Sequence, residues 1–269
     1  MLGQKKLLWW VDNNINSFPH FIVLIGSSGC GKKTLAREIA HKISCVYAEC
    51  SVNVDTVRDV IDSSYQSQTK VMYCFADADN MKSQAKNAML KITEEPPQNA
   101  YFCLTVCDES SLLDTIKSRA YVLQMEEYDP KEISDYVKTK YEVSNELYPL
   151  LCKTPGDVDL LHTYEPRDFY EYVELVVDNI AEVEPANAFK SSGKLALKSD
   201  EGYDLKLFWR AFVQLCLDKM EAGPESVIHY CNGIMATTRY LNKVGRLGIN
   251  KQQLYDKWVF DIRSVWTNE

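Results

Sequence analysis

A chain of 269 residues with 46% hydrophobic residues is long enough for one large domain or two to three small ones, and it can fill their cores. The net charge of −8 argues against broad, sequence-independent coating of DNA, because such binding depends on many contacts from lysine and arginine to phosphate. Any contact with nucleic acid is therefore expected to be local or shared with partners.

The apolar runs are short. The longest, Leu7–Val11 and Phe21–Ile25, fall well below the about 20 residues of a membrane-spanning helix, and the first residues lack a secretory signal pattern. We therefore expect a soluble, cytoplasmic protein. The nine cysteines include no C-x-x-C pair and lack the spacing of a metal site, so we interpret them as reduced core thiols and expect no zinc or other metal.

The first half of the chain alternates short β-rich runs with helical patterns. The expected strands are Phe21–Ile25, Cys45–Ala48, Val71–Phe75, Tyr101–Val106 and Tyr121–Gln124. The expected helices are Lys33–Ile43, Ser83–Thr93, which ends before Pro96-Pro97, and Ser111–Lys117. Because the strand runs are continuously apolar rather than alternating, they predict a parallel sheet covered on both faces, and hence an α/β fold.

The second half of the chain is helical in character. Asp129-Pro130 resembles an N-cap followed by a first-turn proline, and two or three short helices follow, interrupted by Pro155-Gly156. Longer amphipathic helices are expected at Arg167–Glu182, Tyr203–Glu221, Glu225–Val244 and Lys251–Trp266. Their aromatic residues recur at helical spacing, which indicates packing surfaces; they are Phe208, Trp209, Phe212, Tyr240, Trp258 and Trp266. We expect three domains, at 1–125, 126–165 and 166–269.

A phosphate-binding loop follows the first strand. The residues that we expect to contact nucleotide are Gly26, Ser27, Ser28, Gly29, Cys30, Gly31, Lys32, Lys33 and Thr34. They match G-x-x-x-x-G-K, in which glycines let backbone N–H groups turn toward phosphates and the lysine reaches the terminal phosphates. The strand before the loop and the helical pattern after it provide the context that the motif requires.

The loop departs from the motif at Lys33, where a hydroxyl normally binds Mg²⁺. Thr34 does not replace that hydroxyl, because the next residue of a helix is rotated by about 100°. Two interpretations stay open. Either Lys33 turns into solvent and the loop is a relic, or its charge substitutes for part of the metal's charge, so that ATP or ADP binds without Mg²⁺ and without turnover.

The end of the third strand, VMYCFADADNM (Val71–Met81), shows a second departure. Aligned on Ala78-Asp79, Ala76 takes the position of the metal-binding aspartate and Asp77 that of the water-activating glutamate of such NTPases. Both metal contacts are then missing together. A slip of one residue would instead make Asp77 the metal ligand.

The stretches FADADNMKSQAKNAMLKITEEPP and YFCLTVCDESSLLDTIKSRA resemble the AAA+ module of DNA polymerase clamp loaders, especially the δ′ subunit of bacterial polymerase III. The corresponding elements are Ala76–Asp79, Ala85–Lys91, Glu94–Pro97 and Ser118-Arg119-Ala120. The resemblance covers roughly residues 20–160 and implies a RecA-like parallel-sheet domain, a small helical lid and a helical collar that forms a ring with other subunits.

The resemblance implies that Arg119 projects into the ATP site of a neighbouring subunit as an arginine finger, a role that suits a permanently charged guanidinium; a solvated surface arginine is the alternative. Three family positions are changed: Ala120 replaces a cysteine, Cys107 a polar sensor, and Asp157 a sensor arginine. The zinc-binding insertion of many relatives is absent from Ser44–Lys70. These changes predict a stator that has kept the fold and lost its own hydrolysis.

The implied partners are other clamp-loader subunits, a sliding clamp and primed DNA, with no membrane. Lys82, Lys86 and Lys91 either contact DNA phosphates or form a solvated helix face. Two other functions remain open. One is an active AAA+ ATPase subunit that tolerates Lys33 and Asp77, and the other is a small-molecule phosphate-loop kinase.

Overall fold

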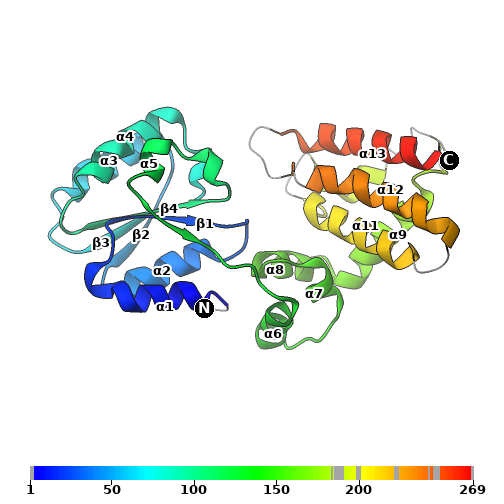
Figure 1. Ribbon diagram of the computed structural model, residues 1–269, viewed down its shortest axis with the longest axis horizontal. Helices are drawn as coiled ribbons and strands as arrows, with labels where there is room; N and C mark the ends of the chain where they lie inside the picture. Colours follow the sequence, from blue (N-terminus) through cyan, green and yellow to red (C-terminus); the bar gives the residue numbers. More distant parts are fainter. Residues whose placement is uncertain are drawn as a thin grey trace. The chain divides into compact units, whose positions relative to one another are not determined.

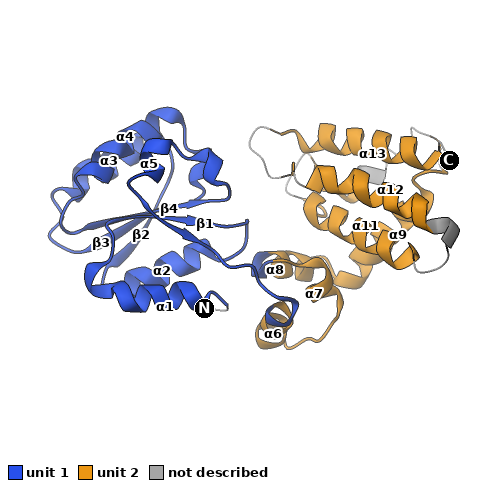
Figure 2. Cartoon of the chain, in the orientation of Figure 1, with its two compact units in different colours: residues 1–132, 154–156 blue, residues 133–153, 157–269 orange. Residues whose placement is uncertain are grey.

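The computed structural model describes residues 3–182, 184, 191–197, 201–220, 224–241, 243–244 and 249–267. The chain forms two compact units (Figure 2): unit 1 comprises residues 1–132 and 154–156, and unit 2 comprises residues 133–153 and 157–269. The predicted boundary at 125/126 stays a prediction. The predicted separation of a lid (126–165) from a collar (166–269) stays a prediction.

Unit 1 is built on a five-stranded parallel sheet with the order β2-β3-β4-β1-β5. The strands are β1 (Phe21–Ile25), β2 (Val46–Cys50), β3 (Val71–Phe75), β4 (Ala100–Val106) and β5 (Tyr121–Gln124). The predicted parallel sheet is thus confirmed, with β2 shifted from the expected Cys45–Ala48. The shift has a local cause: the Cys45 N–H donates to Ala40 O at 2.8 Å, so Cys45 still belongs to the turn after the preceding helix.

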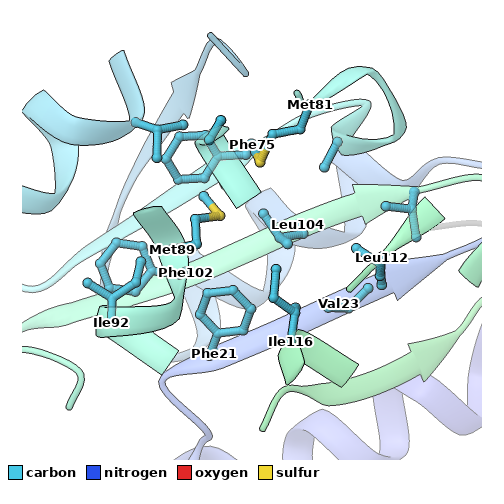
Figure 3. Packing of buried hydrophobic residues seen from close by; sticks show 14 of the residues in the cluster. Phe21, Val23, Phe75, Met81, Met89, Ile92, Phe102, Leu104, Leu112 and Ile116 are labelled. Atoms are coloured by element: carbon cyan, nitrogen blue, oxygen red, sulfur yellow. The ribbon is translucent and has the colours of Figure 1, made fainter. Parts of the chain in front are cut away.

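Helices cover both faces of the sheet (Figure 1). They are α1 (Lys5–Asn14), α2 (Lys32–Lys42), α3 (Val54–Ser64), α4 (Ser83–Glu94) and α5 (Asp114–Lys117), with short 3-10 turns at Ile15–Ser17, Ala78–Asn80 and Glu109–Ser111. Alternate residues of β1 point to opposite faces, and all five are buried. Phe21 and Val23 face a core (Figure 3) formed with α3, α4 and α5, in which Phe102, Met89 and Ile116 are fully buried.

Three features of unit 1 differ from the expectation or were not expected. The helices α1 and α3 were not predicted. The expected helix Ser111–Lys117 is shorter, because Leu112 and Leu113 have extended backbone and the helix begins only at Asp114. In front of it, Asp108 accepts a hydrogen bond from the Ser110 N–H at 2.9 Å and closes a separate turn.

The connection to unit 2 begins with α6 (Pro130–Tyr141), followed by α7 (Leu147–Leu151) and α8 (Pro155–Thr163). The predicted N-cap is confirmed: Asp129 Oδ1 accepts from the Lys131 N–H at 2.7 Å, and Glu132 Oε2 accepts from the Asp129 N–H at 3.1 Å. Pro155-Gly156 does not interrupt the helices. It forms the first turn of α8, where a proline lacks only an N–H that the helix does not use.

The described remainder of unit 2 is mainly helical, as predicted. Its helices are α9 (Pro166–Asn179), α11 (Leu205–Met220), α12 (Pro224–Leu241) and α13 (Lys251–Thr267), with a 3-10 turn at Ser191–Lys194. Trp209 and Trp258 are fully buried and Trp266 is nearly so, which confirms that they belong to the core. Glu221 and Asn242, inside two of the predicted helices, lie outside the described residues. Among the described helices, none is long and apolar enough to cross a bilayer.

Candidate nucleotide site and arginine finger

The phosphate loop occupies the carboxyl edge of the sheet between β1 and α2. Gly29 and Gly31 have φ of +77° and +92°, values that a residue with a Cβ rarely adopts. The side chains of Ser27, Ser28 and Thr34 are exposed. The loop therefore has the turn–helix geometry that its glycine pattern predicts, with α2 beginning at Lys32.

Lys32 is folded back onto its own loop. Its side chain is only 6% exposed, and its ammonium donates to Gly26 O at 2.6 Å and to Ser27 O at 3.0 Å. Cys107 Sγ, from the end of β4, lies 3.7 Å from the same nitrogen. The structure thus brings together the motif lysine and the residue at the predicted sensor position. Burial raises the pKa of the neighbouring Cys30 thiol, and the charge of Lys32 partly opposes that effect.

Lys33 is half-exposed and paired with Glu49 at the end of β2, a contact that neither sequence interpretation anticipated. Its ammonium lies 2.9 Å from Glu49 Oε1, and Arg37 binds the other carboxylate oxygen at 3.2 Å. The hydrogen bond from Lys33 lowers the pKa of Glu49. The same hydrogen bond raises the pKa of Lys33, and the negative charge of Asp77 raises it further. The extra cation of the loop is therefore neutralised within unit 1.

Asp77 follows β3 and lies near enough to Lys33 for its negative charge to act on that ammonium. Asp77 is exposed and has left-handed backbone, with its N–H donating to Thr105 Oγ1 of β4 at 3.0 Å. Asp79 accepts from the Cys107 N–H at 2.8 Å, so its carboxylate organises the loop after β4. Ala76, at the aligned metal position, carries no ligand atom in its side chain.

The first turn of α8 lies against the phosphate loop within unit 1. The Gly156 N–H donates to Gly29 O at 3.0 Å. A Cβ on Gly156 would lie 2.6 Å from Gly29 Cα, and one on Gly29 would lie 2.9 Å from Gly156 Cα. Both positions therefore require glycine for the close approach of two backbones. The sequence indicated Gly156 only as part of an interruption between helices, not as a contact of the phosphate loop.

Asp157, at the predicted sensor position, forms an ion pair with Arg210 within unit 2. Its Oδ2 accepts from Arg210 Nη1 of α11 at 2.6 Å and from the Lys153 N–H at 3.0 Å. The side chains of Asp157 and Arg210 are 13% and 15% exposed. The acidic residue at this position therefore joins α8 to α11.

Arg119 follows α5 and is more than one-third exposed. Its Nη2 lies 2.9 Å from Glu94 Oε1, and its Nη1 donates to Thr115 O at 3.1 Å. Glu94 is the first glutamate of the EEPP element, so the two family motifs meet in space. The neighbouring Ala120 packs against the core of unit 1.

The three lysines of the α4 region differ in their surroundings. Lys82 is exposed, Lys86 donates to Ser111 O, and Lys91 lies 5.1 Å from the centre of the Tyr65 ring. Lys82 is thus the member of this set whose ammonium is best placed for an external anion.

The cysteines are all free. Five are buried, as expected for core thiols: Cys30, Cys74, Cys103, Cys152 and Cys216. Cys107 is exposed because it lies just after β4, at the carboxyl end of the sheet. Within the described ranges, no group of three or more histidine, cysteine or carboxylate side chains is arranged to hold a metal ion.

Solved structures identify the fold class. A DNA polymerase III γ subunit-related protein from Thermotoga maritima matches with a TM-score of 0.54 at 19% identity, covering 96% of this chain and 98% of that one. The RuvB Holliday junction branch migration motor of Thermotoga maritima matches with a TM-score of 0.51 at 18% identity over 83% of this chain and 78% of that one. The chain shares the fold of these two proteins, an AAA+-like parallel-sheet domain with a helical C-terminal part.

Sequence relatives show which AAA+ proteins the chain resembles. Residues 48–129 match the family "DNA polymerase III, delta subunit". The δ′ subunit of Haemophilus influenzae DNA polymerase III is 30% identical over 47% of this chain and 49% of that protein. The γ subunit from Buchnera aphidicola (subsp. Schizaphis graminum) is 24% identical over 51% of this chain and 47% of that protein. The predicted resemblance to clamp-loader subunits is confirmed, and the chain spans about half the length of these relatives.

Proposed function

We propose that this chain is a δ′-like clamp-loader subunit of a DNA replication machine, a largely non-hydrolysing stator that assembles with ATPase subunits. The observation that carries the proposal is the Lys33–Glu49 ion pair at 2.9 Å. It places a neutralised cation at the residue where the phosphate-loop motif has its metal-binding hydroxyl. Together with Ala76 at the aligned aspartate position, it leaves the loop without its two usual side-chain ligands for Mg²⁺.

The position of Lys32 supports weak nucleotide binding in this state. Its ammonium must leave the Gly26 and Ser27 carbonyls before it reaches a phosphate, and those two oxygens would then lose a charged donor. Nucleotide is therefore expected either to stay off the loop or to bind as ATP or ADP without Mg²⁺. No zinc is expected.

Arg119 is proposed to act in trans on the ATP site of the next subunit. Its side chain is 38% exposed, and its guanidinium is held by Glu94, whose side chain is 57% exposed, rather than by a buried network. Exposed ion pairs of this kind contribute little, on the order of 0–1 kcal/mol. A γ-phosphate with higher negative charge can therefore take the place of Glu94 at small cost.

The proposed assembly also defines the partners. Unit 2 would join the other clamp-loader subunits, which together would load a sliding clamp onto primed DNA. Lys82 and Lys86 are proposed to reach DNA phosphates, with Lys86 releasing Ser111 O to do so.

Assembly with the native replication neighbours, followed by mass measurement and an ATPase assay, tests the proposal. Arg119→Ala should lower the DNA-stimulated ATPase rate at the one site that this finger serves by about 10³-fold. The rate of the intact ring should then fall to what the other sites supply, while the mass stays unchanged. Lys117→Ala, two residues away on α5, is the matched control and should leave the rate unaltered. An unchanged rate for Arg119→Ala would remove the finger role, and recovery of a lone monomer would contradict the stator.

An active ATPase subunit is the second candidate, favoured by the exposed position of Asp77 at the end of β3 and by the similarity to γ subunits. Binding of a fluorescent ATP analogue, measured with Mg²⁺ and with EDTA, separates the two. Tight binding that requires Mg²⁺, with hydrolysis by the isolated chain that Lys32→Ala abolishes, would establish the active subunit and exclude the stator.

A further inference from the structure

A groove of about 610 Å³ runs between α1 and the edge strand β5 of unit 1. Its lining is mainly apolar and includes Trp9, Trp10, Tyr121 and Val122. Trp9 is 68% exposed, although it lies on a helix whose other face is buried. Trp10 stacks on Tyr121 with ring centres 4.3 Å apart, which forms a rigid aromatic wall beside the strand.

Among the described residues, the backbone of β5 pairs with a strand on one side only. β5 is the last strand of the sheet and is bonded to β1. The Met125 N–H points to β1, where it donates to Ile25 O at 2.7 Å. Because successive residues of a strand direct their N–H and C=O groups to opposite sides, Gln124 and Val122 direct theirs away from the sheet. Both residues are exposed and line the groove.

The next residue whose backbone groups point away from the sheet is Glu126, and these groups are bonded by a side chain of the same chain. The Gln4 side chain donates through Nε2 to Glu126 O at 2.8 Å and accepts through Oε1 from the Glu126 N–H at 2.7 Å. This pair of bonds is the one that a neighbouring strand would make, and Gln4 is only 2% exposed. The bonds end at Glu126, so a strand that continues them would pair next with Gln124 and Val122.

The charges around the groove favour a negatively charged occupant. Lys5 and Lys6 of α1 line it, and Lys6 is 92% exposed with Glu126 3.6 Å away. The residues of β5, YVLQ, carry no charge. The opposite edge strand, β2, is protected in the usual way for an edge, by Glu49 and its two cations. The β5 edge therefore combines free backbone groups, an aromatic wall and a basic rim in a chain whose net charge is −8.

We propose that this β5–α1 groove is a docking site for an extended acidic peptide segment of a partner protein, which adds a strand to the sheet at Val122 and Gln124. An apolar side chain of the segment packs against Trp9 and Tyr121, and its carboxylates lie near Lys5 and Lys6. The site is independent of the phosphate loop and of Arg119, and it does not rest on the proposed function.

The test uses the full chain and a fluorescein-labelled octapeptide of alternating aspartate and valine with one central phenylalanine, with binding measured by fluorescence anisotropy. Trp9→Ala should weaken binding by about tenfold or more, as for an aromatic anchor. Val122→Pro, which removes an outward N–H at an edge position where proline is tolerated, should have a similar effect. Phe260→Ala is the matched control, because Phe260 is also 68% exposed but lies in unit 2.

The peptide chemistry supplies a second set of controls. The same peptide with lysine in place of aspartate should bind at least about tenfold more weakly, as should the acidic peptide with its backbone nitrogens N-methylated at alternate positions. Circular dichroism verifies that each variant is folded. The proposal is overturned by no saturable binding up to about 1 mM, or by binding that Val122→Pro and Trp9→Ala leave unchanged. Self-association of the chain that Val122→Pro abolishes would also overturn it, because the groove would then hold a second copy. Binding to anionic vesicles instead of to the peptide would overturn it as well.

Discussion

The Asp157–Arg210 pair allows a quantitative test of what the acidic residue at the sensor position does. The two side chains are 13% and 15% exposed, and Asp157 Oδ2 accepts from both Arg210 and the Lys153 N–H. Asp157→Asn keeps the size and an acceptor oxygen but removes the charge. Arg210 cannot lose its proton, so it would remain partly buried without its counterion.

The expected cost lies between two measured limits. Removing one partner of a fully buried pair costs about 3–5 kcal/mol, whereas exposed pairs contribute about 0–1 kcal/mol. For side chains with this exposure we expect a loss of about 2 kcal/mol in the free energy of unfolding of unit 2. Such a loss corresponds to a fall in its Tm of about 5–10 °C for a unit of this size.

Differential scanning calorimetry of the full chain measures the change. Asp178→Asn is the control, because Asp178 pairs with Lys219 at 2.8 Å in the same unit but the two side chains are 48% and 26% exposed. A loss of at most about 1 kcal/mol should lower Tm by no more than about 2.5–5 °C. Arg210→Met and the double variant complete the cycle and isolate the pair energy. Equal shifts for Asp157→Asn and Asp178→Asn would refute the reasoning that burial makes this pair important.

Three further predictions concern unit 1. Gly156→Ala should destabilise it by about 1–3 kcal/mol in urea titrations, because the added Cβ would meet phosphate-loop backbone at 2.6 Å. Gly193→Ala, with no atom within 4 Å of the added Cβ, should have no such effect. The pKa of Glu49 is lowered below 4.5 by its bond from Lys33. The contribution of ionised Glu49 to the free energy of unfolding is therefore complete above pH 4.5 and is lost as the pH falls through the lower pKa of Glu49 in the folded state. Glu49→Gln should flatten the acid limb of a stability–pH curve by less than about 1 kcal/mol, since the pair is exposed; an identical limb would contradict this. A maleimide should label Cys107 first, because that thiol is exposed, and Cys107→Ser should remove the fast phase seen by mass spectrometry.

Slower labelling is expected at Cys50 and Cys216, and the reason is physical. Burial raises the pKa of Cys50 to about 11 and that of Cys216 to about 12. Little of either thiol is then ionised at neutral pH, and the thiolate is the reactive form.

Local sequence patterns determined much of the fold. The glycines of the phosphate loop, the Asp129 cap and the continuously apolar strands each act within a few residues, so their outcome can be predicted from the sequence. The helix α3 was missed although its sequence carries local signals: Asn53 accepts from the Thr56 N–H at 2.7 Å as an N-cap, and Val57 and Ile61 recur at helical spacing. In α3, Val57, Ile61 and Thr56 are β-branched and have low helix propensity, and the helix is stabilised by burying Val57 and Ile61 in the core.

Tertiary structure decided which side chains meet. Lys32 contacts Cys107 from 75 residues away, Asp157 contacts Arg210 from 53 residues away, and Gln4 pairs with Glu126 across 122 residues. Glu49 and Arg210 had no signal in their own neighbourhoods, and the Pro155-Gly156 pattern did not indicate a contact with the phosphate loop. The sequence by itself determined that a phosphate loop and an SR element exist and that the loop lacks its metal-binding hydroxyl. Only the path of the chain decided the partners of each charge, because ion pairs and hydrogen bonds depend on distance in space rather than on spacing along the chain.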